Sequence, residues 1–246
     1  MRIPRIYLPV ALSLGAHVEL DDVSAHHVRS VLRLKKGHSL SLFDGEGFEY
    51  GSVLVLVSKK SVTLEVESAG PCDTESRLVI YLGLGISRGE RMDFAIQKSV
   101  ELGVAGVSPL FTERTVVKVD TTVRALQKQS HWQKVAQHAS EQSGRAKVPE
   151  VNPPQPLLSW LKQCSGLKLF LDPLSTRSLG DLDTVPDCVS LLSGPEGGFS
   201  PLEREQAFDA GFTGICLGPR ILRTETAVLA GVALLQATWG DLGFRG

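Results

Sequence analysis

The chain of 246 residues has few of the features that mark secreted, metal-binding or membrane proteins. Its four cysteines are far apart, and none stands in a Cys-x-x-Cys pair or near a suitably spaced histidine, which argues against zinc or disulfides. The longest apolar stretch, "AVLAGVALLQATW", is too short to cross a bilayer. The opening "MRIPRIYLPV" interrupts a short apolar stretch with charge and proline, unlike a signal peptide. We therefore expect a cytoplasmic protein that uses neither a metal nor a membrane.

An excess of charge of one sign is also missing. The 26 Lys and Arg residues nearly balance the 27 Asp and Glu residues, so net charge identifies no partner. The distribution is less even, because residues 1–60 carry 8 basic and 6 acidic side chains and residues 85–150 carry 10 and 7. Such mildly basic segments permit contact with a polyanion without requiring it.

The first 70 residues have the pattern of a small β-rich domain. Segments 3–8, 39–45 and 51–68 alternate apolar and polar residues, as half-buried strands do, and one helix is predicted over 23–37. The segment "SAGPCDTES" at 68–76 has no periodicity and many turn-forming residues. It predicts a linker, with one domain over 1–70 and a second over 76–246.

In the second domain, short apolar strands alternate with amphipathic helices. Strands are predicted over 77–84, 106–113, 167–173, 189–195 and 213–219, and helices over 91–103, 121–143, 157–163, 201–211 and 224–240. Near-continuous apolar strands between helices indicate a parallel sheet that is covered on both faces. The fold class is therefore α/β for this domain.

Four polar loops, three of which contain glycine, follow predicted strands of this sheet: "GISRGER" at 85–91, "DPLSTRS" at 172–178, "SGPEGGFS" at 193–200 and "LGPRILRTETA" at 217–227. In an open parallel sheet, ligands bind outside the carboxyl ends of the strands. The loops therefore predict a binding site at one edge of the sheet.

The loop around Gly194 resembles a phosphate-binding loop only superficially. It lacks the Gly-Lys-Ser/Thr of a P-loop and the Gly-x-Gly-x-x-Gly of a Rossmann fold, and Glu196 stands where a lysine would help. Ser200 and Glu203 have the spacing of a capping box with proline between them, which predicts a helix start. The capping box does not explain the three glycines that precede it. Because the loop is acidic and lacks lysine, it suits a neutral or cationic cofactor better than a phosphate.

The loop around Arg223 permits two interpretations. Thr224 or Thr226 has the chemistry to cap the following helix. A cation at a helix N-terminus opposes the helix dipole, so Arg223 needs a nearby anion. That anion is either a ligand or Glu225 in a structural ion pair, and the sequence leaves both open.

Several motifs together resemble one known family. "MRIPRIYLP", "LFDG", "SRGERMDFAIQKSVELGV", "PLFTERTVVK", "WQKVAQHASEQSGRAKVPEV", "LSGPEGGFSPLE" and "LGPRILRTETA" are similar, in this order, to the RsmE family of 16S ribosomal RNA (uridine-N3) methyltransferases. The last two motifs alone would indicate only the wider SPOUT superfamily. The resemblance covers essentially the whole chain.

This resemblance implies a PUA-like N-terminal β-barrel that helps to hold RNA, and a SPOUT-type α/β domain with a C-terminal trefoil knot. It also implies S-adenosylmethionine as cofactor, a homodimer, 16S rRNA as substrate, either free or in the small ribosomal subunit, and no metal. The implied cofactor-binding residues are Leu171, Asp172, Pro173, Ser193, Gly194, Pro195, Glu196, Gly197, Gly198, Leu217, Gly218, Pro219, Ile221, Leu222 and Thr224.

The resemblance places Arg223 and Glu225 near the methyl group and the uridine. Uridine N3 must lose its proton, and a positioned arginine stabilises the charge that spreads onto the flanking carbonyl oxygens, so Arg223 is the predicted catalytic residue. Glu225, Glu196 or solvent is expected to accept the proton.

The predicted RNA-binding residues form two groups, Arg2, Arg5, Arg29, Arg33, Lys35 and Lys36 in the first domain, and Arg88 and Arg91 in the second. Two other functions stay open at this point. One is a SPOUT methyltransferase of another RNA position, and the other is a noncatalytic RNA-binding or ribosome-assembly protein.

Overall fold

The computed structural model describes residues 3–115 and 122–243. The chain divides into two compact units. The first comprises Met1–Glu75 and Ser140–Val148, and the second comprises Ser76–Ala139 and Pro149–Gly246. The segment 140–148, which the sequence assigned to the second domain, thus returns to the first unit.

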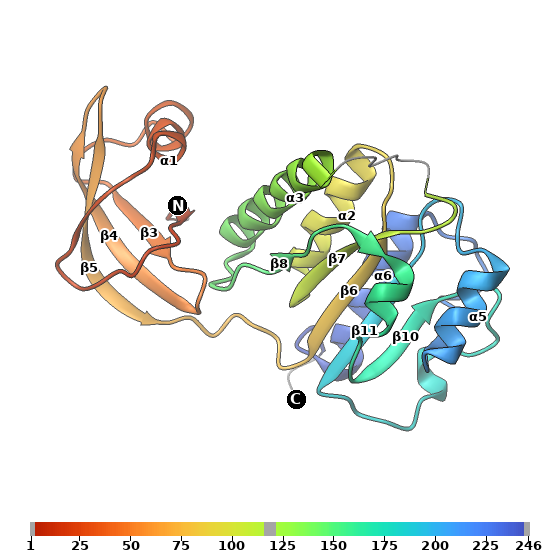
Figure 1. Cartoon of the computed structure of the whole chain (residues 1–246). Coiled ribbons are helices and arrows are strands. Elements are labelled where there is room, and N and C mark those ends of the chain that lie inside the picture. The colour runs from red at the N-terminus through yellow and green to blue at the C-terminus, as the bar shows by residue number, and fades with distance from the viewer. Residues whose placement is uncertain (1–2, 116–121, 244–246) are drawn as a thin grey trace. The chain divides into compact units, whose positions relative to one another are not determined.

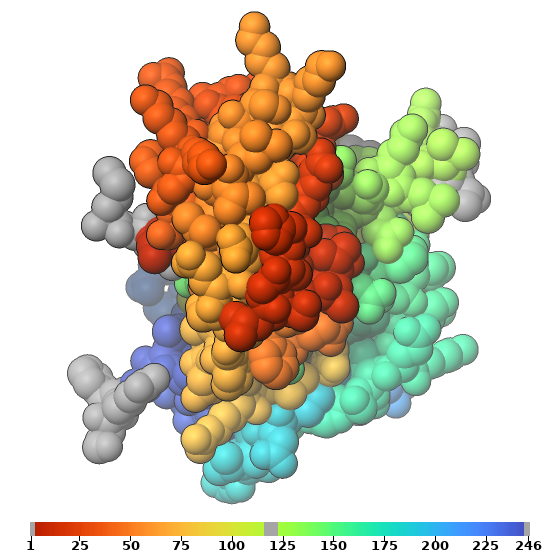
Figure 2. Space-filling model, turned by 90° about the vertical axis from the view of Figure 1, so that its left-hand side faces the viewer, coloured from red at the N-terminus to blue at the C-terminus, as the bar shows by residue number. Residues whose placement is uncertain are grey.

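The first unit is built on a five-stranded sheet (Figure 1), and the space-filling view shows part of the surface of this unit in red to orange (Figure 2). Its strands are β1 (Arg5–Tyr7), β2 (His17–Glu19), β3 (Ser39–Phe43), β4 (Phe48–Val57) and β5 (Val62–Pro71), in the order β1-β3-β4-β5-β2. β1 and β3 are parallel, and the other pairs are antiparallel. Leu42, Leu54 and Leu64 are buried in its core because alternate residues of each strand face inward.

The helix expected over 23–37 is shorter and less regular than the sequence predicts. It is α1 (Asp22–His26), followed by a π-helical turn over His27–Val31. Asp21 caps α1, because its Oδ1 accepts hydrogen bonds from the backbone N–H groups of residues 23 and 24.

The second unit is an α/β layer structure, as the sequence predicts (Figure 1). Its strands are β6 (Val79–Gly85), β7 (Gly106–Phe111), β8 (Glu150–Val151), β9 (Gln155–Pro156), β10 (Leu167–Leu171), β11 (Cys188–Ser193) and β12 (Thr213–Ile215). Its helices are α2 (Glu90–Glu101), α3 (Thr122–Ser143, whose last four residues belong to the first unit), α4 (Leu157–Leu161), the 3-10 turn Leu179–Asp181, α5 (Pro201–Asp209) and α6 (Thr224–Trp239).

The sheet runs β12-β10-β11-β6-β7-β8, with β9 beside β7, and each of these neighbouring pairs is parallel. Helices α2, α3 and α6 pack on one face in a large apolar cluster. α4 and α5 contribute to a second apolar cluster, which contains Phe170 of β10 and Leu192 of β11. The residues next to these two along the strands, such as Leu169 and Leu191, belong to the large cluster on the other face. Both faces are therefore buried, which explains the apolar strands.

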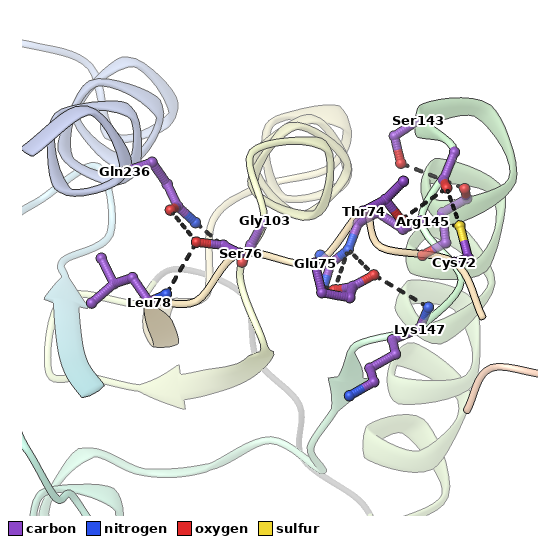
Figure 3. A network of polar contacts seen from close by, with 12 residues as sticks. Cys72, Thr74, Glu75, Ser76, Leu78, Gly103, Ser143, Arg145, Lys147 and Gln236 are labelled. Atoms are coloured by element: carbon purple, nitrogen blue, oxygen red, sulfur yellow. Dashed lines mark hydrogen bonds and ion pairs between the residues drawn. The ribbon is translucent and has the colours of Figure 1, made fainter. Parts of the chain in front are cut away.

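The linker is held by polar contacts on each side of the division between Glu75 and Ser76 (Figure 3). Within the first unit, the Glu75 carboxylate accepts hydrogen bonds from Arg145 Nε at 3.1 Å and from the backbone N–H of Lys147 at 3.3 Å. Within the second, Ser76 Oγ donates to Gln236 Oε1 at 2.6 Å. The end of the segment that the sequence predicts as a linker is therefore held in place by hydrogen bonds of Glu75 and Ser76.

Candidate functional site

The parallel sheet brings all four predicted loops to one edge. β12, β10, β11 and β6 are successive neighbours, so their carboxyl ends lie together. The loops that follow these strands border a pocket of about 640 Å³ within the second unit. This volume lies within the range of roughly 300 to 1,000 Å³ that is usual for small-molecule sites.

Most of the predicted cofactor residues line this pocket: Leu171, Asp172, Pro173, Ser193, Gly194, Pro195, Glu196, Gly197, Gly198, Ile221, Leu222 and Thr224. Leu217 and Gly218 line a smaller pocket of about 70 Å³ that shares Leu171 and Leu222 with the first. Pro219 borders neither of the two.

Close backbone packing explains the glycines around Glu196. A Cβ on Gly197 would lie 2.9 Å from Arg114 Cβ, and a Cβ on Gly85 would lie 2.5 Å from Pro195. Gly198 has a φ of +66°, which favours glycine, and its N–H donates to the Pro195 carbonyl at 2.8 Å. The loop is therefore a tight turn pressed against its neighbours.

Glu196 joins this turn to the loop after β6. Its Oε1 accepts a hydrogen bond from the Arg88 backbone N–H at 3.1 Å and lies 3.4 Å from Arg91 Nη1. Burial raises the pKa of the Glu196 carboxyl, but the hydrogen bonds to the ionised form and the Arg91 charge outweigh burial and lower the pKa. Glu196 is therefore a carboxylate engaged in holding two loops together.

Arg114 and Glu203 border the same region and were not predicted as site residues. Arg114 lines the pocket and donates from Nη1 to the Gly197 carbonyl at 2.8 Å. Glu203 closes the predicted capping box of α5, and its Oε1 also accepts from the Glu113 N–H at 2.7 Å. The position of Arg114 after β7 is the sequence signal that would have indicated it.

Asp172 faces Arg204 across the pocket wall. Arg204 Nη2 donates to Asp172 Oδ2 at 2.6 Å, and the Asp172 side chain is 3% exposed. The backbone N–H of Leu174 also donates to Asp172, at 3.1 Å. Sequence reasoning could not find Arg204, because the pair joins two elements that are 32 residues apart.

Arg223 is the N-cap residue of α6, so the expected threonine cap is wrong. Its backbone is extended, its side chain makes no capping hydrogen bond, and Thr224 is instead the first helical residue and buried. Arg223 is exposed and lines the pocket. Within the described residues it forms no ion pair, so the structural pair with Glu225 is absent.

Glu225 lies in the first turn of α6 and does not border the pocket. Its Oε2 atom is buried and finds no hydrogen-bond partner among residues 3–115 and 122–243. A buried carboxylate oxygen without a partner is costly. This residue therefore differs in environment from Glu196, with which the sequence grouped it.

The predicted RNA-binding residues fall into different environments. Arg33, Lys35 and Lys36 are exposed in the first unit, and Arg88 and Arg91 are exposed in the second. Arg29 is half-buried and donates to the Ser58 carbonyl at 3.1 Å. Arg2 lies outside the described residues.

Arg5 does not offer a free guanidinium. Its side chain is 7% exposed, pairs with Glu49 at 3.0 Å and lies over the Phe43 ring at 4.7 Å. It also donates to the carbonyls of Ser140 and Arg145, both at 3.2 Å. Its prediction as a phosphate contact is corrected: within the first unit, Arg5 fastens β1 to the returning segment.

Other ligand and membrane features are lacking in the part of the chain that the structure describes. There, His, Cys, Asp and Glu side chains form no group of three or more that would hold a metal ion. Nor does any described helix combine the length and hydropathy needed to cross a bilayer.

Family models cover both units. A model described as "RNA methyltransferase domain" matches residues 74–236, and one described as "RNA methyltransferase PUA domain" matches residues 20–67. Together with the sheets, these matches confirm the predicted fold class, an α/β domain of the SPOUT type with a small N-terminal PUA-like domain. The trefoil knot and the closure of the first sheet into a barrel stay predictions.

Relatives of known name match along nearly the whole chain. A ribosomal RNA small subunit methyltransferase E from Buchnera aphidicola (subspecies Schizaphis graminum) is 37% identical, over 98% of this chain and 98% of its own. One from Bacillus subtilis is 32% identical over 86% of each. A crystal structure of one from Neisseria gonorrhoeae, bound to S-adenosyl methionine, has a TM-score of 0.91 at 40% identity and covers 98% of this chain and 99% of that one.

Proposed function

The chain belongs to the family of ribosomal RNA small subunit methyltransferase E proteins, and we propose that it methylates N3 of a specific uridine in 16S ribosomal RNA, using S-adenosylmethionine. The observation that carries the proposal is the convergence of the loops after β10, β11 and β12 on one pocket, with an exposed Arg223 at its rim that forms no ion pair within the described residues. Family membership favours this function over the other two that the sequence left open.

The residues around the pocket fit S-adenosylmethionine. Leu171 and Leu222 provide apolar wall for an adenine ring, and the ionised Glu196 suits a cationic ligand. Arg204 Nε is buried and has no partner within the described residues, so a ligand acceptor would satisfy it. When bound, S-adenosylmethionine supplies a methyl group that a positively charged sulfur activates.

Arg223 would stabilise the uridine as N3 loses its proton. The negative charge spreads onto the two carbonyl oxygens that flank N3, and a guanidinium presents parallel donors that match such a planar group. Arg223 is available for this role because no ion pair or capping bond within the described chain engages it. An interaction that strengthens as charge develops lowers the barrier.

We assign the proton of N3 to water at the open rim of the pocket. Glu196 has a lowered pKa and is held by Arg88 and Arg91, so it is a weak base with a positioning role. Glu225 does not border the pocket. The side chain of Ile221, 89% exposed at the same rim, indicates that water reaches this place.

The proposal includes the partners that the sequence implied. The substrate is 16S rRNA in the small ribosomal subunit, the protein acts in the cytoplasm as a homodimer, and the α/β domain is knotted. Exposed Arg33, Lys35 and Lys36 of the first unit would contact RNA phosphates as a group. Their contribution predicts an affinity for RNA that falls as salt rises.

Nucleoside mass spectrometry of small-subunit rRNA, from cells with and without this protein, tests the function. Loss of 3-methyluridine without the protein, and its return with purified protein and S-adenosylmethionine, are the expected results. A methyl mark that disappears from another nucleoside would support the SPOUT alternative. Unchanged rRNA, with no calorimetric binding of S-adenosylmethionine, would support a noncatalytic protein.

A further inference from the structure

A second pocket lies in the α/β unit, between the start of α2 and one face of α3. Its volume is about 330 Å³. Ser87 and Gly89 of the loop after β6 line it, while Arg91, in the first turn of α2, lines the candidate active site. The loop after β6, together with the first turn of α2, is therefore a wall that the two pockets share.

The floor of this second pocket is built from a fixed carboxylate. Asp93 Oδ1 accepts a hydrogen bond from Trp132 Nε1 at 3.2 Å, and Asp93 Oδ2 lies 2.8 Å from His131 Nε2. The Trp132 residue is 3% exposed. The negative charge of Asp93 is thus engaged by groups from α3, and among the described lining residues it is the sole carboxylate.

The other ionisable side chains that line the pocket are basic. Arg124, Lys128 and His131 are spaced four and three residues apart on α3, so they lie on one face of the helix. Lys128 Nζ lies 5.5 Å from the centroid of the Trp132 ring, which keeps the ammonium over the pocket. A concave site lined by basic side chains, in which the one carboxylate among the described lining residues is already engaged, favours an anion.

The start of α2 adds to this preference. Its N-cap is Gly89, and no side chain caps the first turn. Backbone N–H groups at a helix N-terminus attract anions, and Gly89 borders the pocket.

We propose that this pocket binds a backbone phosphate of the RNA strand next to the uridine that enters the active site. The inference rests on the proposed function, and it identifies the side on which the strand leaves the active site. The shared loop favours RNA over a free anion, because adjacent nucleotides of one strand would occupy both sides of the wall. Lys128 would then fix the register of the strand without reading its bases.

The variant Lys128→Gln tests this, with Lys134→Gln as its matched control. Lys134 is exposed on the same helix and does not border the pocket. Small ribosomal subunits from cells lacking the protein are the substrate. Lys128→Gln should raise KM for subunits roughly threefold to tenfold and reduce the slope of log affinity against log salt by about one. The kcat and the calorimetric affinity for S-adenosylmethionine should not change, and Lys134→Gln should match the wild type.

A gain-of-binding variant guards against a trivial loss of folding. Gln127 is exposed and borders the pocket, so Gln127→Lys should tighten binding of subunits and steepen the salt slope. If Lys128→Gln and Lys134→Gln have the same KM and slope, the inference is wrong. If inorganic phosphate binds the pocket but neither Lys128→Gln nor Gln127→Lys changes the KM for subunits, the site holds a free anion and the inference is also wrong.

Failure of the proposed function would look different. In that case the wild-type protein would transfer no methyl group to the subunits, whatever residue stands at 128.

Discussion

Two charged residues of the candidate site, Glu196 and Arg223, differ in how far the fold engages them. Glu196 accepts hydrogen bonds from one neighbouring loop and has a lowered pKa. Arg223 has no ion pair within the described chain and stands exposed at the start of α6. Glu196, whose charge is engaged by hydrogen bonds, therefore stabilises the loops, whereas the side chain of Arg223 is available to contact a ligand.

Arg223→Ala should lower kcat by about 100-fold to 1,000-fold, because it removes the donors that stabilise the developing charge. Calorimetry should show nearly unchanged affinity for S-adenosylmethionine. Arg223→Lys should recover only part of the rate, because an ammonium lacks the planar pair of donors. Arg77→Ala, an exposed arginine before the amino end of β6, is the control and should be fully active. Near-normal turnover by Arg223→Ala would remove it from the mechanism.

Glu196→Gln should change how stability depends on pH. Because the folded-state pKa of Glu196 is lowered, its ionisation stabilises the fold above the ordinary value of 4.5, and this contribution disappears as the pH falls through the lowered pKa. The difference in Tm between wild type and Glu196→Gln should thus be largest near neutral pH and shrink in acid. A difference that is constant across this range would contradict the loop-holding role.

At the scale of elements, the strand ends and helix starts are joined by side chains that serve two elements at once. Glu203 closes the cap of α5 and also accepts the N–H of Glu113 in the loop after β7. Arg114, next to it, reaches the Gly197 carbonyl. The loops of the pocket are therefore positioned from neighbouring elements rather than by their own sequence alone.

Glu203→Ala should destabilise the protein by about 1 to 3 kcal/mol, because it leaves the backbone N–H groups of Ser200 and Glu113 without their acceptor. Thermal melting would show a Tm lower by several degrees. Glu205→Ala in the same helix is the control, since Glu205 is exposed. Equal melting temperatures for the two variants would argue against the double role of Glu203.

At the scale of the whole molecule, the chain forms two units with separate apolar cores, and the first is completed by residues 140–148. Arg145 ties this segment to the end of the linker through Glu75 (Figure 3). Arg5 ties it to β1. The N-terminal unit therefore depends on a segment that is far away in sequence.

Arg145→Ala should destabilise the protein by about 3 kcal/mol, because it leaves the largely buried Glu75 carboxylate without its ion pair. Denaturant unfolding monitors this loss. Lys147→Ala is the control, because only the backbone N–H of Lys147 contacts Glu75 and the substitution retains it. If Arg145→Ala were as stable as the control, residues 140–148 would not be essential to the first unit.

The sequence by itself determined the elements and the edge at which the site lies. Helices α2, α5 and α6 begin and end within two residues of the predicted bounds, because apolar periodicity and capping residues act between near neighbours. The parallel sheet followed from apolar strands between helices. Most of the cofactor-binding residues that the family resemblance implied lie in loops at this edge and line one pocket.

Only the tertiary structure decided which distant residues meet. The two-residue strands β8 and β9 exist because they pair with β7, and the Asp172–Arg204 pair and the internal role of Arg5 join separate elements. The N-cap of α6 is Arg223 and not the expected threonine, because Thr224 is already the first helical residue and is buried. Such contacts depend on packing between remote segments, and no local pattern of residues encodes them.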